Sequence, residues 1–192
     1  MVLGSSSPRR REILDDIGIR FAVVHADIDE SALPGETVDK TALRLAREKA
    51  MKISMRHPDA LVIAADTLVA LDGEMMGKPD DAPHAAAMLE KLSGKTHDVF
   101  TAVTFSLGAE GLLETVLCQS RVAFKHLGRT VIDTYIGTGE PLGKAGAYAI
   151  QGKGAVLIES YAGSFSNIVG LPAREVLRFF LAFGIDRLPW QD

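Results

Sequence analysis

An apolar run in the first half of the chain is interrupted by a single aspartate. Residues 60–65 are continuously apolar and have the length of a strand, Asp66 and Thr67 follow, and the apolar run resumes over residues 68–71. A strand without polar alternation is typical of a sheet that is covered on both faces. Burying a charge without a partner is expensive, so Asp66 is the strongest anomaly in the sequence. The alternative is a turn between two strands, with Asp66 as its cap.

The remaining hydrophobic pattern alternates strands and helices at both ends of the chain and places adjacent antiparallel strands in the middle. The pair Asp72-Gly73 predicts a hairpin over residues 68–76. The further elements that we expect are strands at 1–4, 21–24, 99–107, 113–124 and 155–158, helices at 8–17, 37–56, 82–92, 130–136 and 172–183, a glycine-rich segment at 137–154 and a loop at 164–172. Together they predict one domain, residues 1–192, with a mixed α/β sheet, flanking helices and two lobes around a cleft.

The stretch of residues 4–11, Gly-Ser-Ser-Ser-Pro-Arg-Arg-Arg, joins the first strand to the first helix. Ser7 is a good N-cap, and Pro8 suits the first helical position. Three arginines in the first turn are unfavourable for an isolated helix, because the helix dipole is positive there. Free N–H groups and guanidinium groups bind phosphate, so we expect Arg9 and Arg10 to hold an anion. The alternative is that Arg9 pairs with Glu12 and Arg11 with Asp15, whereas Arg10 has no such partner.

Three further charged side chains stand at unusual positions. Glu30 lies in an acidic loop after the second strand, Lys49 falls on the apolar face of the second helix, and Lys78 is held between a glycine and a proline. The alternative for Lys49 is a packed stem whose ammonium reaches water, and a loop lysine such as Lys78 is usually solvated. Together the cations suit a polyphosphate, while Glu30 and Asp66 suit a divalent cation such as Mg²⁺ or a catalytic base.

The composition argues against several classes of protein. A net charge of −4 disfavours general nucleic-acid binding, which needs a broad basic surface. The single cysteine, Cys118, excludes an internal disulfide and a multi-cysteine zinc site, and it fits a reducing compartment. No apolar run reaches the roughly 20 residues needed to span a bilayer, and nothing resembles an export signal. We therefore expect a cytoplasmic protein without a membrane partner.

Two common nucleotide-binding signatures are missing. Residues 139–145 are one residue too short for a Walker A loop and lack the hydroxyl that would hold magnesium, and no Gly-x-Gly-x-x-Gly follows the first strand. The serines at residues 5–7 have no Gly-x-Ser-x-Gly elbow around them, which argues against a serine nucleophile. Neither familiar phosphate loop therefore accounts for the charged residues.

Several short motifs follow one another in a characteristic order. They are Ser5-Ser6-Ser7-Pro8-Arg9-Arg10, Asp29-Glu30, Lys49, Ala65-Asp66-Thr67, Gly77-Lys78-Pro79, Lys144-Ala145-Gly146-Ala147-Tyr148, and the stretch from Gly163-Ser164 to Val169-Gly170-Leu171-Pro172. From about residue 2 to residue 184 the chain resembles the Maf family of nucleoside triphosphate pyrophosphatases. The resemblance implies a two-lobed α/β fold with the nucleotide in its cleft, similar to inosine triphosphate pyrophosphatases, in a cytoplasmic homodimer.

The resemblance also implies the chemistry of the site. Asp66 would accept the proton of a water that attacks the α-phosphorus of a nucleoside triphosphate and releases pyrophosphate. Glu30 would join Asp66 at a divalent metal, Mg²⁺ or Mn²⁺, and Lys49 and Lys78 would complete the catalytic set. The groups implied to hold and neutralise the triphosphate are Ser5, Arg9, Arg10, Lys49 and Lys78.

Two residues imply the base that is bound. Thr67 and Gln151 are similar to the branch of the family that acts on dTTP and UTP. A glutamine offers both a donor and an acceptor, which the imide edge of thymine or uracil requires. One position departs from the family, which commonly has an aspartate where this chain has Gly143. The effect of Gly143 on turnover or on metal preference therefore stays open.

Three other functions stay open at this point. Proteins of this family are also linked to restraint of cell division, so the chain could be a nucleotide-binding regulator with little catalysis. A branch similar overall prefers 7-methyl-GTP, and a related pyrophosphatase would act on ITP. A mere binding module has no need of a buried base, so the presence of Asp66 together with Glu30 and the two lysines favours an enzyme.

Overall fold

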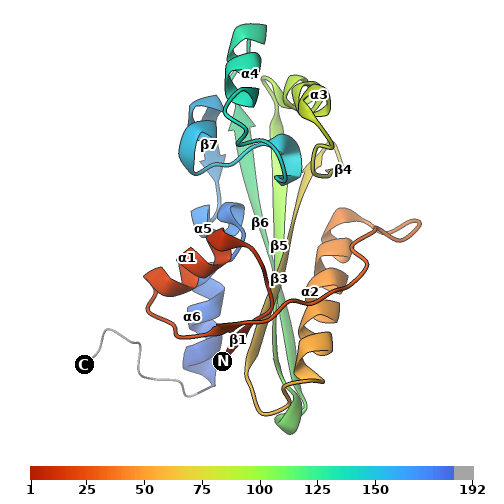
Figure 1. Ribbon diagram of the computed structural model, residues 1–192, viewed down its shortest axis with the longest axis vertical. Coiled ribbons are helices and arrows are strands. Elements are labelled where there is room, and N and C mark those ends of the chain that lie inside the picture. Colours follow the sequence, from red (N-terminus) through yellow and green to blue (C-terminus); the bar gives the residue numbers. More distant parts are fainter. Residues whose placement is uncertain (184–192) are drawn as a thin grey trace.

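The computed structural model describes residues 1–183, and within them one seven-stranded mixed sheet is flanked by helices (Figure 1). The strands are β1 (Val2–Leu3), β2 (Ala22–Val23), β3 (Val62–Leu71), β4 (Glu74–Met76), β5 (Thr96–Leu107), β6 (Leu112–Phe124) and β7 (Ile158–Ala162). The helices are α1 (Pro8–Asp16), α2 (Val38–Ser54), α3 (Ala82–Leu92), α4 (Arg129–Ile136), α5 (Phe165–Val169) and α6 (Ala173–Ala182), with 3₁₀ turns η1 (Gly108–Glu110), η2 (Ala145–Ala147) and η3 (Gly152–Leu157). The expected α/β class is confirmed.

The sheet combines parallel and antiparallel pairing in the order β2-β1-β3-β5-β6-β7. Strand β1 is parallel to both of its neighbours, whereas β3, β5, β6 and β7 pair antiparallel. Strand β4 returns along β3 through Asp72 and Gly73, whose φ values are 54° and 83°. Positive φ at both central residues is what a two-residue hairpin turn of type I′ requires, so the predicted hairpin is confirmed.

Strand β3 passes through Asp66 without a break, because Asp66 lies directly opposite Ala102 in an uninterrupted antiparallel ladder with β5. The alternative of a turn at this position is therefore wrong. Successive side chains of a strand point to opposite faces of the sheet, so Asp66 and Thr67 must serve different faces.

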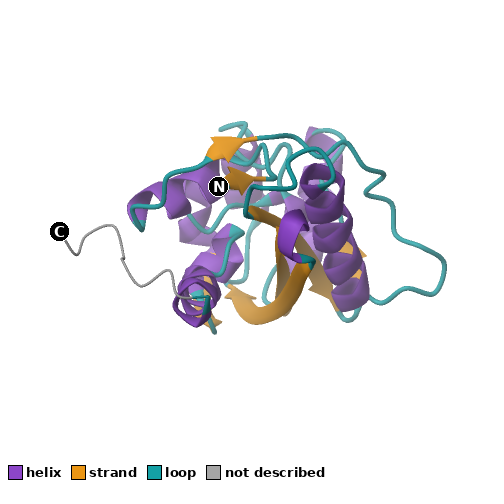
Figure 2. Ribbon diagram, turned by 90° about the horizontal axis from the view of Figure 1, so that it is seen from below, coloured by secondary structure: helices purple, strands orange, loops and turns teal. Residues whose placement is uncertain are grey.

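Each face of the sheet is covered by helices (Figures 1 and 2). On one face α2 packs closely through Ala42 and Ala46 against Ala102 of β5. On the other face α6 stacks Phe179 on Phe105 of β5, with ring centroids 3.8 Å apart.

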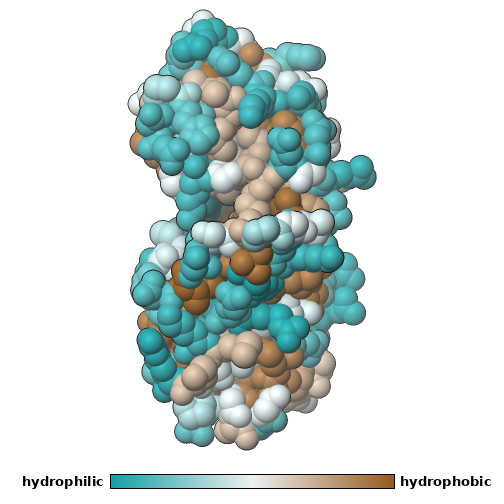
Figure 3. Space-filling view, turned by 90° about the vertical axis from the view of Figure 1, so that its right-hand side faces the viewer, coloured by the Kyte–Doolittle hydropathy of each residue, from teal (hydrophilic) through white to brown (hydrophobic). Residues whose placement is uncertain are grey.

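The long strands β3, β5 and β6 run through two lobes. Helices α1, α2, α5 and α6 surround their lower part in Figure 1, and α3, α4, β4 and β7 surround their upper part. A constriction separates the lobes in the space-filling view (Figure 3). Because both lobes share these three strands, the cleft between the lobes is a feature of one sheet. Within residues 1–183, no helix has the length and apolar character needed to cross a membrane.

Two predicted elements near the C-terminal end are wrong. The strand expected at 155–158 is wrong for residues 155–157, which belong to η3; the start of this turn is held by the N–H groups of Lys153 and Gly154, which donate to the carboxylate of Glu140. The segment expected as a loop contains α5, which Ser164 caps by accepting from the N–H of Asn167. Residue 184, expected to end the last helix, lies outside the described residues.

Candidate active site

A cleft of about 700 Å³ opens between the two lobes. Its volume is within the range of sites that bind small molecules, about 300–1,000 Å³. Eight of the nine residues proposed from the sequence line it: Ser5, Arg9, Arg10, Glu30, Lys49, Asp66, Thr67 and Lys78. The fold thus brings together side chains that lie up to 73 residues apart, from Ser5 to Lys78.

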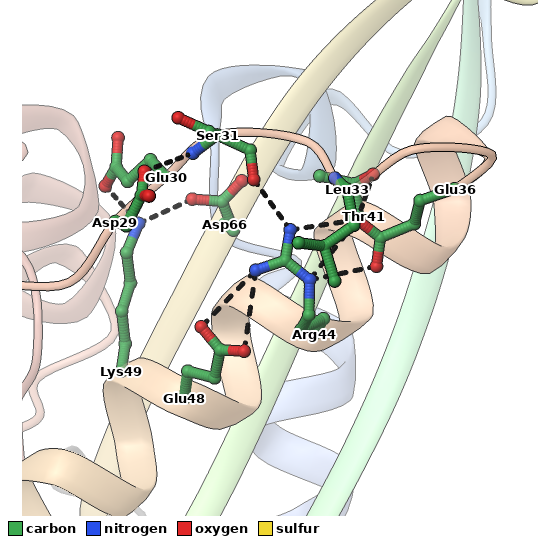
Figure 4. Close-up of polar contacts among 10 residues, drawn as sticks. All are labelled: Asp29, Glu30, Ser31, Leu33, Glu36, Thr41, Arg44, Glu48, Lys49 and Asp66. Carbon is green, nitrogen blue, oxygen red and sulfur yellow. Dashed lines mark hydrogen bonds and ion pairs between the residues drawn. The ribbon is translucent and has the colours of Figure 1, made fainter.

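Lys49 binds two carboxylates at the floor of this cleft (Figure 4). Its ammonium nitrogen lies 2.5 Å from Oδ1 of Asp66 and 2.6 Å from Oε1 of Glu30. Lys49 and Asp66 are only 7% and 6% exposed, so the alternative of a lysine that reaches water is wrong. Helix α2 supplies the lysine and β3 the aspartate, because Asp66 points to the sheet face that α2 covers. A buried ion pair with a second carboxylate at its edge is costly to form and signals function.

Glu30 reaches the same point from the loop that precedes α2. Partial burial by itself would raise its pKa, but the hydrogen bond and charge of Lys49, with the charges of Lys78 and Arg10, lower the pKa below its usual value. The ammonium of Lys78 lies 4.0 Å from Oε2 of Glu30 and is mostly exposed. Lys78 is therefore free to move toward an anion in the cleft, whereas Lys49 is not.

Arg10 lies on the opposite face of the sheet and makes three hydrogen bonds to protein groups. Its guanidinium donates to the carbonyl of Gly170 at 2.7 Å, to Oγ of Ser5 at 2.9 Å and to Oγ1 of Thr67 at 3.0 Å. Burial lowers its pKa, while the charge of Asp66 raises it. Since an arginine stays protonated in a protein, its remaining N–H donors are available to an anion. Arg10 thus also joins α1, β3 and the end of α5.

The N-terminus of α1 faces the cleft as the sequence predicts. Ser7 is its N-cap, but the Ser7 side chain makes no capping hydrogen bond, and Pro8 occupies the first turn. Arg9 also lines the cleft, where burial lowers its pKa and the nearby Tyr135 and acidic groups raise it. The uncapped amides and the two arginines leave this end of the helix suited to an anion.

The upper side of the cleft comes from the glycine-rich segment of residues 137–154. Tyr148 and Ile150 line the cleft there, whereas Gln151, the ninth proposed residue, is not among the lining residues and is half-buried beside them. Gly143 also lines the cleft, and its φ of +73° would strain the backbone of any aspartate placed there. This side offers an aromatic ring and an aliphatic side chain, with Lys144 as its one charged lining residue among those described.

A buried pair holds the aromatic ring of this segment in place. Nε2 of His97 lies 2.8 Å from the hydroxyl of Tyr148, and both side chains are buried. Burial lowers the pKa of His97 to about 4, so the imidazole is neutral at pH 7. Sequence reasoning gave no role to Tyr148, His97 or the apolar lining residues Ile168 and Val169. Apolar cleft residues follow the same pattern as core residues, so only the structure separates them.

Comparison with known proteins gives one consistent result. The family model described as Maf-like protein matches residues 1–183. A relative from Myxococcus xanthus (strain DK1622), named dTTP/UTP pyrophosphatase, is 50% identical over 191 residues, which cover 100% of this chain and 95% of the relative. One from Desulfotalea psychrophila (strain LSv54 / DSM 12343), with the same name, is 43% identical over 185 residues, 96% of this chain and 95% of the relative.

The fold is shared more widely. The solved structure of the Staphylococcus aureus Ham1 protein matches with a TM-score of 0.53 at 15% identity, covering 95% of this chain and 98% of that chain. At this identity the match speaks for the fold alone, and it agrees with the mixed sheet and flanking helices described above.

Proposed function

The chain belongs to the Maf-like protein family, and on that premise we propose that it hydrolyses nucleoside triphosphates, most readily dTTP and UTP, to a nucleoside monophosphate and pyrophosphate. The names of the curated relatives support this substrate class. The observation that carries the proposal is the buried Asp66–Lys49 pair, with the exposed Glu30 carboxylate at its edge, at the floor of a cleft whose rim is cationic. Carboxylates beside cations are what phosphoryl transfer needs.

In the proposed reaction Asp66 acts as the general base. A water oxygen forms a bond to the α-phosphorus with its own electron pair, and its proton passes to the carboxylate of Asp66. The bond from the α-phosphorus to the bridging oxygen breaks, and pyrophosphate leaves with that electron pair. Lys49 orients the Asp66 carboxylate through their 2.5 Å contact.

The cations around the cleft would bind the triphosphate. Arg9, Arg10 and Lys78 line it, and Ser5 adds a hydroxyl that already orients Arg10. Their charges would neutralise the phosphate oxygens as negative charge shifts onto the leaving pyrophosphate. Because Lys78 is mostly exposed and only 4.0 Å from Glu30, we expect it to exchange this carboxylate for a phosphate when the nucleotide binds.

The donor set also fits a divalent cation. Within residues 1–183 no group of three or more histidine, cysteine or acidic side chains is arranged to hold a metal. Mg²⁺, however, is usually held by one or two carboxylates and completed by substrate phosphates and water, and Glu30 and Asp66 supply two carboxylates at one point. We propose that these two residues would hold Mg²⁺ or Mn²⁺ together with the nucleotide. When bound, the metal would supply further neutralisation of the phosphate oxygens.

A substrate panel tests the proposed function. The protein is incubated with dTTP, UTP, CTP, 7-methyl-GTP and ITP in Mg²⁺ or Mn²⁺, and released pyrophosphate is measured. Faster release from dTTP and UTP than from the other nucleotides is expected. Saturable dTTP binding without any pyrophosphate would contradict the enzyme and favour a binding protein, and a preference for 7-methyl-GTP or ITP would contradict the proposed base specificity.

A further inference from the structure

The loop that carries Glu30 has little apolar anchorage. It connects β2 to α2 over residues 24–37, and none of residues 27–37 is buried. At the start of the loop, Val24 and Ala26 pack against a small core cluster. Since burial does not hold residues 27–37, polar contacts must determine where the Glu30 carboxylate lies.

Arg44 of α2 supplies the central polar contact of this loop (Figure 4). Its Nε and Nη2 atoms each donate to the carboxylate of Glu36 at 2.9 Å, and Nη2 also donates to the carbonyl of Ser31 at 2.9 Å. The Arg44 and Glu36 side chains are only 19% and 12% exposed, and Arg44 also reaches Glu48. A two-pronged arginine–carboxylate pair with such low exposure fixes geometry better than a surface ion pair.

Glu36 extends the same network back into the loop and into the helix. Its carboxylate accepts from the N–H of Leu33 and from the hydroxyl of Thr41. The hydrogen bond from Arg44 contributes most to lowering the pKa of Glu36 to about 2, and the bonds from Leu33 and Thr41 add to it. The pair therefore stays charged in any neutral buffer. We call Arg44 and Glu36 the loop clamp.

The clamp and the catalytic lysine belong to the same helix. Arg44 holds the carbonyl of Ser31, the residue directly after Glu30, while Lys49, five residues further along α2, holds the Glu30 carboxylate. Five residues correspond to a rise of about 7.5 Å on a helix. Two adjacent loop residues are thus tied to two fixed points of one rigid element. Neither Arg44 nor Glu36 is among the residues that line the cleft.

We propose that Arg44 is a positioning residue for catalysis: by holding the loop through Glu36 and Ser31, it places the Glu30 carboxylate beside Lys49 and Asp66. This role rests on the proposed pyrophosphatase function, in which Glu30 takes part. Arg44 itself touches neither the nucleotide nor the reacting atoms.

The first test replaces Arg44 by methionine, which keeps the length of the stem and removes the fork. We expect kcat/KM for dTTP to fall about tenfold or more, in the range found when groups that orient ligating residues are lost. The matched control is Arg129→Met, because Arg129 also bonds two carboxylates, those of Glu90 and Asp133, but is 70% exposed and lies on α4. The kcat/KM of Arg129→Met for dTTP should equal that of the wild type.

A double-substitution cycle separates positioning from a general loss of structure. If Arg44 acts only through Glu30, Arg44→Met should cost less than about twofold in an enzyme that already carries Glu30→Gln, because contacts that act as a unit are not additive. An equal loss in both backgrounds, or no loss in the wild-type background, would overturn the proposal.

Amide hydrogen exchange gives a readout that does not depend on activity. In Arg44→Met the hydrogen-bonded amides of Ser31, Leu33 and Glu36 should exchange at least about tenfold faster, while those in the centre of α2 stay protected. Glu36→Gln, a milder variant, should give the same pattern with a smaller increase. Unchanged exchange in the loop would overturn the clamp. If the wild-type protein releases no pyrophosphate, the proposed function fails, and the exchange experiment still decides whether Arg44 holds the loop.

Discussion

The two sides of the cleft are built by different means. The charged wall, which we define as Arg9, Arg10, Glu30, Lys49 and Asp66, stands mainly on α1, α2 and β3, with side chains tied to one another or to neighbouring elements. The glycine-rich wall, which we define as residues 137–151, lies between α4 and η3 and is mostly irregular backbone around the short turn η2. Regular elements hold side chains with more precision than irregular backbone does.

The glycine-rich wall is instead held by bonds from side chains to backbone. Glu140 accepts from two N–H groups after residue 151, and the hydroxyl of Tyr135 accepts from the N–H of Ala149. At Gly152 the φ is +80°, and a Cβ would lie 2.5 Å from an oxygen of Glu140. We expect the two walls to divide the tasks: the charged wall would determine how fast any nucleotide is cleaved, and the glycine-rich wall would determine which base is accepted. Four experiments test this division, from the largest expected effect to the smallest.

Asp66→Asn should have the largest effect. Removing a general base costs about 10²–10⁴-fold in rate, so kcat should fall by that amount for every nucleotide, with little change in nucleotide binding. Steady-state pyrophosphate release and direct dTTP binding measure the two quantities. Asp59→Asn, at an exposed position, is the matched control. Near-normal activity of Asp66→Asn would mean that Asp66 is not the base.

The second effect is a decrease in the free energy of unfolding at low pH, caused by His97, which bonds Tyr148 of the glycine-rich wall. The pKa of His97 is lowered from 6.5 to about 4 in the folded protein, so between these values the unfolded chain binds a proton that the folded chain does not. Stability is therefore lost as the pH falls from about 6.5 toward 4. At pH 5 this loss is about 2 kcal/mol relative to pH 7.

Urea unfolding of the wild type and of His97→Gln at pH 7 and pH 5 measures this loss. The glutamine does not titrate, so its stability should decrease by about 2 kcal/mol less between the two pH values than that of the wild type. Equal decreases would show that His97 titrates normally in the folded state and is not held neutral beneath Tyr148.

The third experiment tests the base specificity. Gln151→Ala should reduce the preference for dTTP over CTP about tenfold, the value of roughly one hydrogen bond, and should leave the effect of Asp66→Asn unchanged. Gln119→Ala, which removes an exposed glutamine of β6 that donates to Asp98 of β5, is the control. If Gln151→Ala lowers kcat equally for all nucleotides, the two walls do not divide the tasks as we expect.

Glu140→Gln should give the smallest effect. The amide keeps an acceptor for Gly154 but loses the charge that strengthens the bonds, a difference of about 1 kcal/mol or less. KM for dTTP should rise about threefold with kcat almost unchanged. A fall in kcat without a change in KM would instead link Glu140 to Arg9, whose pKa it influences across the cleft.

Much of the fold could be predicted because local patterns and tertiary contacts agree. The Asp72-Gly73 hairpin, the Asp81 cap of α3 and the apolar stripe of α2 each follow from a few neighbouring residues, and the structure confirms them. The predictions of a strand over residues 155–157 and of a loop where α5 lies were wrong for the opposite reason. The turn η3 depends on Glu140, which lies 13 or 14 residues before the amides from which it accepts. Helix α5 has only five residues, which is too short to show a helical period.

The residues of the candidate site likewise fall into those that the sequence indicates and those that it does not. The sequence marks Asp66, Lys49 and Arg10 as anomalies, because each places a charge where an apolar pattern or a helix dipole opposes it. It does not indicate Tyr148, His97 or Arg44. An aromatic residue, a buried histidine and an arginine on an amphipathic helix all fit ordinary patterns, and only their partners in space make them unusual.

By itself the sequence determined the elements, the family and the identity of most charged residues that line the cleft, because those follow from local periodicity and from residue type. Only the tertiary structure decided that Asp66 and Thr67 serve opposite faces of one unbroken strand and that Lys49 joins Asp66 to Glu30. It also decided that Arg44 holds the loop on which Glu30 stands. These relations depend on strand register and on contacts between distant segments, which a linear pattern does not contain.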